Sequence, residues 1–589
     1  MVLEMSGTAG ASLTIELVPR WGEGLVHTGE RFKSEADGSI RSVDRLDGLL
    51  SGFELLSEDG QWISAPGQVG WMSLGQNRME MSLTNLPSGH YRALRFDQGL
   101  SPEANHSDPA SHGPLDLLNP SVNGLHWNWQ GGYVFLALEG HWWAAGGTEG
   151  GYSYHLANDH SRRTFELPFH FDLTNGTRLV LGLQLDQIFA GRQAIVAGDE
   201  TASTHSRTND QLALRILENL KESWTLTLPG GTSNAVHPAS RSSEVVMALN
   251  APLHRFQMPG SFPQPVLPRD NPLTEPGVAL GRALFSEKRL SGNQSQSCAS
   301  CHRMEAAFSD ASRRFSRGSE GVEGQRNAMG LLNLAWQTNF FWDGRARSLR
   351  EQVLAPIQNP LEMNASLENV TRELSAAGYG PAFEAAFGPG LIDSDRIARA
   401  LEQYLLTLVA GHSRYDRVQA GLDQPTPEEA RGYQLFFTEY DPRHGQYGAD
   451  CFHCHGGALF SDFGFHNNGL DDLQHLPDEG CAGVTRRTSD RARFKTPSLR
   501  NVAVTGPYMH DGRFGTLEEV VRHYVSGVKR SETLDPNLAK HPEGGVPLSK
   551  EDQKALVAFL KMLTEEELLP TATGPASVST SPGRNPISE

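Results

Sequence analysis

The spacing of apolar residues changes once along this 589-residue chain. Between Leu13 and about Asn250, apolar side chains recur at every second position, as in "LTIELV" and "RLVLGLQL", and Gly, Asn, Asp and Pro interrupt the runs. Successive side chains of a strand point to opposite faces, so this period predicts strands with one buried face. We therefore expect an antiparallel β-sandwich over residues 1–250.

A proline-rich stretch separates this region from one with helical spacing. Residues 251–271 include "HRFQMPGSFPQPVLPRDN", and proline fixes φ and removes a backbone donor, which predicts an extended linker. Beyond it, "EPGVALGRALFSE" and "DRIARALEQYLL" repeat apolar residues three and four apart. Thr426 with Glu429, and Ser549 with Asp552, have the spacing of helix N-caps. Residues 567–589, rich in Pro, Ser and Thr, are predicted to be disordered.

Charge and hydropathy narrow the classes of partner. With 69 acidic and 51 basic side chains, the net charge is -18, which would repel a nucleic-acid backbone. No apolar run reaches the roughly 18 residues of a membrane span. The first residues lack the basic and apolar regions of a signal peptide. Either the signal is not part of this sequence, or the protein is not exported.

Cysteine usage points to covalently bound haem. Four of the five cysteines lie in "CASCH" and "CFHCH", which supply Cys298, Cys301 and His302, and Cys451, Cys454 and His455; the role of Cys481 stays open. Each thiol of such a motif can bind one vinyl group, and the adjacent His can reach the iron. Zinc would want four ligands in one cluster, and a thioredoxin-like pair needs a βαβ unit, so both are less favoured. Two motifs predict two related helical lobes, over residues 272–425 and 426–566.

Residues 268–564 resemble the bacterial di-haem cytochrome c peroxidase and MauG superfamily, through "FFWDGR", "NPLEM" and "FKTPSLRNVAVTGPYMHDGR" as well as the two haem motifs. The resemblance implies a mainly α protein with two cytochrome c-like lobes and two c-type haems. In that superfamily the first haem handles hydrogen peroxide, and the second stores or relays electrons. We therefore expect an oxidoreductase that acts with peroxide.

The resemblance also assigns roles to single residues. Glu362 matches the distal acid–base for peroxide cleavage, with Gln352 and Pro356 beside it, and Trp342 matches the indole between the haems. Taken alone, Glu362 would be a solvated charge and Trp342 a core side chain. Three residues match the oxygen ligands of an inter-haem calcium ion: Asn327, Thr505 and Pro507.

The axial ligands are expected to differ between the haems. No histidine lies between Arg303 and Phe341, where related peroxidases carry a sixth ligand, so His302 should be the only protein ligand of the first haem. Counting from the "HDG" element to the family position of the second distal ligand reaches Tyr524, whose phenolate would lower the haem potential. Met509 is the alternative, and a core position is the bland interpretation of Tyr524.

The N-terminal region resembles the MbnP family of periplasmic copper-binding proteins, through "DRLDGLLSGFELLSEDGQW", "ANHSDP", "NPSVNGLHWNWQGGY" and "YSYHLAN". In that family a MauG-like partner oxidises a tryptophan to kynurenine, which helps to bind copper. The resemblance implies a periplasmic or secreted protein. It makes Trp127 and Trp129 candidates for modification, although indoles also commonly fill cores. His106 and His155 are the copper candidates, and Asp108 or His126 are weaker ones.

Three functions stay open at this point. The first is an oxidase that modifies a tryptophan of its own or a partner's MbnP-like domain and so creates a copper site. The second is a peroxide scavenger that takes electrons from a small cytochrome or cupredoxin. The third is a copper-binding or delivery protein. A homodimer is possible in each case.

Overall fold

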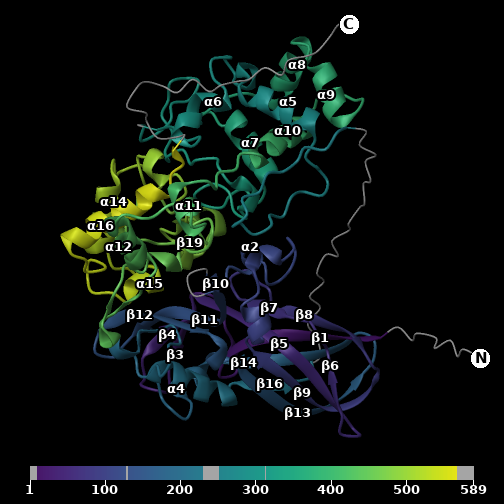
Figure 1. Cartoon of the computed structure of the whole chain (residues 1–589), viewed down its shortest axis with the longest axis vertical. Coiled ribbons are helices and arrows are strands. Elements are labelled where there is room, and N and C mark those ends of the chain that lie inside the picture. Colours follow the sequence, from purple (N-terminus) through teal and green to yellow (C-terminus); the bar gives the residue numbers. More distant parts are fainter. Residues whose placement is uncertain (1–9, 128–130, 230–250, 312, 567–589) are drawn as a thin grey trace, which may run out of the picture.

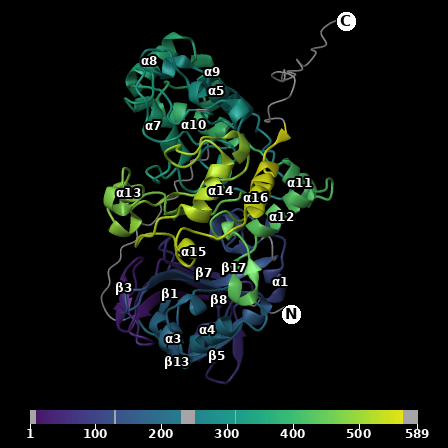
Figure 2. The same cartoon turned by 90° about the vertical axis from the view of Figure 1, so that its left-hand side faces the viewer.

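The computed structural model describes residues 10–127, 131–229, 251–311 and 313–566. A β-rich domain, a middle helical lobe and an outer helical lobe follow one another in space (Figure 1). The middle lobe is the second one in sequence, and the view in Figure 2 gives the same order. Trp129 and the predicted disordered tail lie outside the described residues.

The N-terminal domain is a sandwich of two sheets, as predicted. Its alternating pattern is visible in β1 (Ala11–Trp21), where buried and half-buried residues alternate. The smaller sheet joins β1 to β2 (Gly24–Leu25), β8 (Glu80–Leu86), β14 (Thr177–Gln184) and β16 (Trp224–Thr227). The larger sheet has the central order β13 (Arg163–Leu173), β9 (Gly89–Gln98), β5 (Arg45–Ser57), β11 (Gly132–Trp143), β12 (Glu149–Ala157) and β15 (Ser203–Thr204).

Two strand pairs depart from the purely antiparallel arrangement. Strand β1 runs parallel to β14, and β12 runs parallel to β15. Both partners are distant in sequence, so the chain makes long crossings before it returns to the sheet edge. Hydrophobic periodicity reports which face is buried but carries no information on strand direction. The second crossing brings the residues after β15 beside β12.

Short strands surround the larger sheet and shape its edge. They are β3 (Arg31–Lys33), β4 (Ile40–Ser42), β6 (Trp62–Ser64), β7 (Gly70–Ser73) and β10 (His126–Trp127). Strand β10 pairs with the start of β11, with His126 opposite Tyr133 and Trp127 opposite Gly132. This pairing fixes Trp127 at the end of the domain that faces the helical lobes (Figure 1).

Residues 251–271 contain no helix or strand, as the prolines predict, yet they are packed rather than free. Phe262 is fully buried. Trp336 Nε1 donates to the carbonyl oxygen of Pro263 at 2.6 Å, and Asn119 Nδ2 donates to that of Gln264 at 3.0 Å. The segment therefore contacts both the first lobe and the β-domain.

Each helical lobe is built around one crossed pair of helices. In the first lobe α5 (Glu275–Phe285) crosses α10 (Ser394–Leu406), and in the second α12 (Pro427–Phe436) crosses α16 (Lys550–Met562). The N-cap predicted at Thr426 forms a capping box with Glu429, and Ser549 accepts from the Asp552 amide. The other main helices are α6 (Cys298–Cys301), α7 (Leu349–Gln358), α8 (Leu367–Ala376), α9 (Gly380–Phe387), α11 (Arg414–Gln419), α13 (Ala482–Thr485), α14 (Leu517–Ser526) and α15 (Pro536–Ala539).

The same packing device occurs at both crossings. A Cβ at Gly281 would overlap the carbonyl oxygen of Ala400, and a Cβ at Gly432 would overlap that of Ala555. Only glycine lets the two backbones approach so closely. The repeated device supports the prediction of two related lobes. Among the described residues, no helix combines the length and apolar character needed to cross a bilayer.

Candidate active site

The first C-x-x-C-H motif lies at the wall of a large cavity. Cys298 and Cys301 lie in α6, and His302 Nδ1 donates to the carbonyl oxygen of Phe308 at 2.7 Å. A carbonyl can only accept, so Nε2 of His302 keeps its lone pair for a metal. The cavity has a volume of about 1090 Å³ and is lined by both thiols and His302. Its size and these donors fit a covalently attached haem.

The predicted distal residues line the same cavity. Glu362, Gln352, Pro356 and Trp342 all contribute to its wall. Burial raises the pKa of the Glu362 carboxyl, and the hydrogen bond that it accepts from Asn359 Nδ2 at 2.7 Å partly offsets the shift. Gln352 Oε1 is buried without a hydrogen-bond partner within the described part of the chain. A buried acceptor of this kind also fits a pocket made for a polar ligand.

Residues of the second lobe close the cavity. Lys495 and His510 both line it. Burial lowers the pKa of Lys495 to about 7, and its Nζ donates to Gln337 Oε1 at 2.6 Å. The ring of His510 stacks on Phe494 with centroids 3.6 Å apart. The sequence predicts neither Lys495 nor His510 at the first haem site; His510 belongs to the "HDG" element from which Tyr524 is counted.

The second motif has the same local design. His455 Nδ1 donates to the carbonyl oxygen of Phe460 at 3.1 Å, which again leaves Nε2 for a metal. The two candidate distal ligands lie together, because Asn468 Nδ2 is 3.4 Å from Met509 Sδ and 3.4 Å from Tyr524 Oη. Burial raises the pKa of Tyr524 to about 12. The structure places both candidates beside Asn468 and does not distinguish which of them is the haem ligand.

Trp342 lies between the lobes, next to the calcium candidates. Its Nε1 donates to the carbonyl oxygen of Asn327 at 2.9 Å, and its side chain is buried. A second cavity, of about 100 Å³, is lined by Trp342 and by all three calcium candidates, Asn327, Thr505 and Pro507. Their carbonyl and side-chain oxygens suit a hard cation. The calcium role of the three residues stays a prediction.

The copper candidates are divided among different places. His106 is about half exposed, and its two ring nitrogens contact the Gly131 carbonyl at 2.8 Å and Asp159 at 3.1 Å. Asp108 caps a short helix by accepting from the Ala110 amide. The ring of His126 packs edge-on against Tyr133. None of these three belongs to a potential metal-ligand cluster among the described residues.

His155 instead belongs to a buried histidine cluster that the sequence does not predict. Its Nδ1 lies 3.2 Å from Nε2 of His205, and His453 of the second haem motif completes the group. His205 directly follows β15, and the parallel pairing of β15 with β12 brings it beside His155. No local motif marks His205. His453 stands at a spacer position of "CFHCH", where sequence reasoning assigns no role.

Trp127 packs against this cluster. Its ring stacks on His205 with centroids 5.5 Å apart, and it meets His155 edge-on at 5.7 Å. It also meets Phe452 edge-on at 6.5 Å. Because Phe452 directly follows Cys451, the indole lies beside the attachment site of the second haem.

Comparisons with known proteins match different families to the N-terminal and C-terminal parts of the chain. Residues 10–206 match the family model MbnP, and residues 275–424 match the model described as di-haem cytochrome c peroxidase. The methylamine utilization protein MauG of Methylorubrum extorquens is 37% identical over 353 residues, which cover 58% of this chain and 94% of that protein. The chain belongs to the MauG and di-haem cytochrome c peroxidase family.

Two further relatives show the breadth of this family. Cytochrome c551 peroxidase of Nitrosomonas europaea is 32% identical over 335 residues, covering 55% of this chain and 88% of that protein. A solved MauG-like protein associated with microbial copper homeostasis is 34% identical, covers 54% of this chain and 98% of that chain, and superposes with a TM-score of 0.48. The two family models and the MauG relative show that the chain joins an MbnP domain to a MauG-like di-haem oxidoreductase, as the sequence predicted.

Proposed function

We propose that this chain is a peroxide-dependent di-haem oxidase that converts Trp127 of its own MbnP domain to kynurenine and thereby completes a copper site. The observation that carries the proposal is the position of Trp127. Its indole lies within 6.5 Å of Phe452, inside the second haem motif, and within 5.7 Å of two buried histidines. An oxidisable ring, a haem-attachment site and a set of metal ligands thus meet at one interface.

The docking of the domains supports a reaction within one chain. The β-domain packs on the second lobe rather than on the first (Figure 2). Asn537 Nδ2 donates to Glu139 Oε2 at 3.1 Å, and Arg443 donates to the Ser203 carbonyl at 2.9 Å. Glu139 and Asn537 are buried, so this is a packed interface rather than a loose tether. The substrate would be held in place beside the relay haem.

The chemistry balances with hydrogen peroxide as the oxidant. One indole and two molecules of peroxide yield kynurenine, formic acid and one water. The C2–C3 bond of the indole breaks, C3 becomes a ketone, C2 leaves as formate, and the ring nitrogen becomes an aniline amine. Four electrons leave the indole and reduce the two peroxides. The haems, when bound, would supply the redox chemistry that carries these electrons.

The residues of the first cavity would handle protons. In our proposal Glu362 takes a proton from one peroxide oxygen and returns it to the other, and Gln352 orients the ligand. Trp342 would lie on the electron route between the lobes, and Tyr524, or Met509 in its place, would complete the second haem site. Calcium at Asn327, Thr505 and Pro507 would hold the lobes together at that route. A periplasmic or secreted location accords with covalent haem and copper.

Peptide mapping of the full-length holoprotein tests the proposal. Treatment with hydrogen peroxide should add the mass of one oxygen and remove that of one carbon from the peptide that contains Trp127. Trp127→Phe should abolish the gain on this peptide, while Trp143→Phe, at another tryptophan that packs on a histidine, should leave it unchanged. Modification of Trp129 alone would refute the assignment to Trp127. Peroxide consumption with a reduced cytochrome or cupredoxin, and no mass gain, would favour the scavenger function instead.

A further inference from the structure

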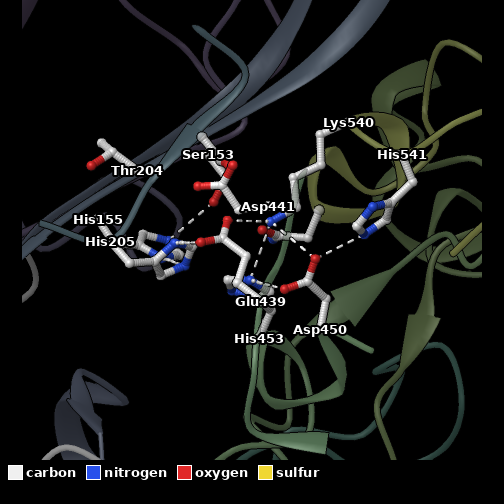
Figure 3. A network of polar contacts seen from close by, with 12 residues as sticks. Ser153, His155, Thr204, His205, Glu439, Asp441, Asp450, His453, Lys540 and His541 are labelled. Carbon is white, nitrogen blue, oxygen red and sulfur yellow. Dashed lines mark hydrogen bonds and ion pairs between the residues drawn. The ribbon is translucent and has the colours of Figure 1, made fainter. Parts of the chain in front are cut away.

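Three imidazoles meet in the contact between the β-domain and the second lobe. His155 comes from β12, His205 follows β15, and His453 lies between the two cysteines of the second haem motif. One ring nitrogen of each lies within 4.8 Å of the others, and the three side chains are at most 4% exposed. Figure 3 shows His155 and His205 side by side on the β-domain side, with His453 reaching toward them from the second lobe.

A carboxylate lies close to each ring. His155 Nε2 lies 2.7 Å from Glu139, His205 Nδ1 lies 2.5 Å from Glu439, and His453 Nε2 lies 3.3 Å from Asp450. Histidine ligands of metals almost always donate their second N–H to such a group, which fixes the tautomer and aims the other nitrogen at the metal. His155 has this arrangement with Glu139, and Glu439 and Asp450 bring a carboxylate close to the other two rings.

The nitrogens of His155 and His205 face each other. With the Nε2 proton of His155 directed to Glu139, Nδ1 of His155 presents a lone pair toward Nε2 of His205 at 3.2 Å. The three side chains are almost fully buried, and burial disfavours the charged imidazolium form. Neutral imidazole is the form that binds metals.

The spacing also suits a metal. Bonds of about 2.0 Å from a metal to imidazole nitrogens, in a trigonal or tetrahedral site, place the nitrogens roughly 3.3 to 3.5 Å apart. The pair formed by His155 and His205 is already close to this separation at 3.2 Å, and a nitrogen of His453 lies within 4.8 Å of both.

The surroundings favour an ion of low charge. Glu139 pairs with Arg45 at 3.1 Å, and Lys540 pairs with Glu439 at 3.2 Å and with Asp450 at 3.4 Å. Lys540 Nζ also lies 3.3 Å from His453 Nε2. Since basic groups already face the carboxylates, a monovalent ion adds the least charge to this buried site. Among the metals that imidazole suits, copper as Cu(I) meets that condition.

We propose that His155, His205 and His453 form an interdomain copper site in which the haem-attachment motif of the second lobe supplies the third ligand. The choice of copper rests on the proposed function, whereas the three-histidine site stands on its own geometry. Such a site ties the two domains together and places the metal next to the second haem.

A variant that cannot form kynurenine at position 127 allows the histidine site to be tested separately from the proposed function. Cu(I) affinity is measured by competition with a chromophoric chelator, on full-length holoprotein that carries Trp127→Phe. Adding His453→Ser copies the residue at the same place of the first motif and should lower the affinity more than about 100-fold, since even the loss of an outer-shell partner costs 10- to 100-fold. The matched control is His106→Ser, which should change nothing. Equal affinity with and without His453→Ser would overturn the inference, whatever happens to Trp127.

Two further measurements guard against misfolding and a wrong metal. His205→Gln lies outside the haem motif and should weaken copper binding as well, while haem content stays that of the parent. X-ray absorption at the copper edge should give three imidazole nitrogens in the Trp127→Phe protein and two after His453→Ser. Unchanged coordination would refute the third ligand. Tighter binding of Zn(II) than of Cu(I) by the same histidines would refute the assignment to copper.

Discussion

The two haem motifs share their covalent chemistry and differ in the residues between the cysteines. In the first, these are Ala299 and Ser300, and Ser300 Oγ accepts from the Ser297 amide at 3.0 Å, so it only caps its own helix. In the second, they are Phe452, which is buried against the MbnP domain, and His453, which joins the histidine cluster. Thioether attachment uses only the two cysteines, so it places no requirement on the two residues between them. The two motifs therefore differ at positions that haem attachment does not constrain.

The lobes also differ in the candidate distal side chains near each haem motif. The first lobe opens into a cavity that contains Glu362 and Gln352. The second lobe presents Tyr524 and Met509 around Asn468. In the proposed function, the first lobe would admit a small polar reactant and the second would complete its haem site from its own side chains. Four predictions test how far the two lobes differ and what they share, in order of decreasing effect.

The largest effect is expected from Glu362→Gln. Loss of the proposed proton-transfer group in the first cavity should slow the peroxide-dependent mass gain at Trp127 by about 10² to 10⁴-fold. The control is Glu368→Gln, an exposed acid in the first turn of α8, which should leave the rate unchanged. A Glu362→Gln enzyme with the parent rate would remove the contrast between the lobes.

The next effect concerns what the lobes share. Gly281→Ala and Gly432→Ala both force a methyl group against a facing carbonyl, so each should lower the free energy of unfolding by about 1–3 kcal/mol or more. Gly380→Ala is the control, because no atom lies within 4 Å of its added Cβ. Chemical denaturation of the holoprotein measures all three. Destabilisation in one lobe only would mean that the helix crossings are not equivalent.

A smaller, spectroscopic effect separates the two iron sites. We expect a high-spin ferric signal from the first haem without prior reduction, because the sequence offers no loop histidine as a sixth ligand. Tyr524→Phe should alter the low-spin signal of the second haem, whereas Met509→Leu should do so less. A bis-histidine signal from the first haem would implicate another ligand, such as His510 in its cavity wall. A larger change with Met509→Leu would reverse the choice of ligand.

The smallest effect is a pH dependence. Because burial raises the pKa of Glu362, its carboxylate is less stable in the folded protein than in the unfolded chain. Its contribution to stability is thus present at low pH and is lost as the pH rises through the raised pKa. Glu362→Gln should therefore raise the melting temperature slightly at neutral pH, and the oxidation rate of the parent should fall as the pH drops through the same pKa. A melting temperature lowered by the substitution would contradict this sign.

Signals confined to short segments of the sequence predicted the haem motifs, the helix caps and the strands. The haem motifs are contiguous, the caps at Thr426 and Ser549 depend on residues three positions apart, and strand burial follows a period of two. Each of these signals is confined to one segment, and the structure confirms the helices and the sandwich where they were predicted. The distal set around Glu362 also came from the sequence, through family resemblance.

The histidine cluster depended on tertiary structure alone. His106 and His155 looked equivalent in sequence, yet His106 lies at the surface with Asp159, and His155 lies in the interface. His205 reaches His155 only because β15 returns parallel to β12, and His453 reaches both only because the β-domain docks on the second lobe. Strand direction and domain docking depend on non-local burial, which leaves no periodic trace in the residues concerned. The sequence could therefore determine the haem sites, whereas only packing between distant segments decided which histidines meet.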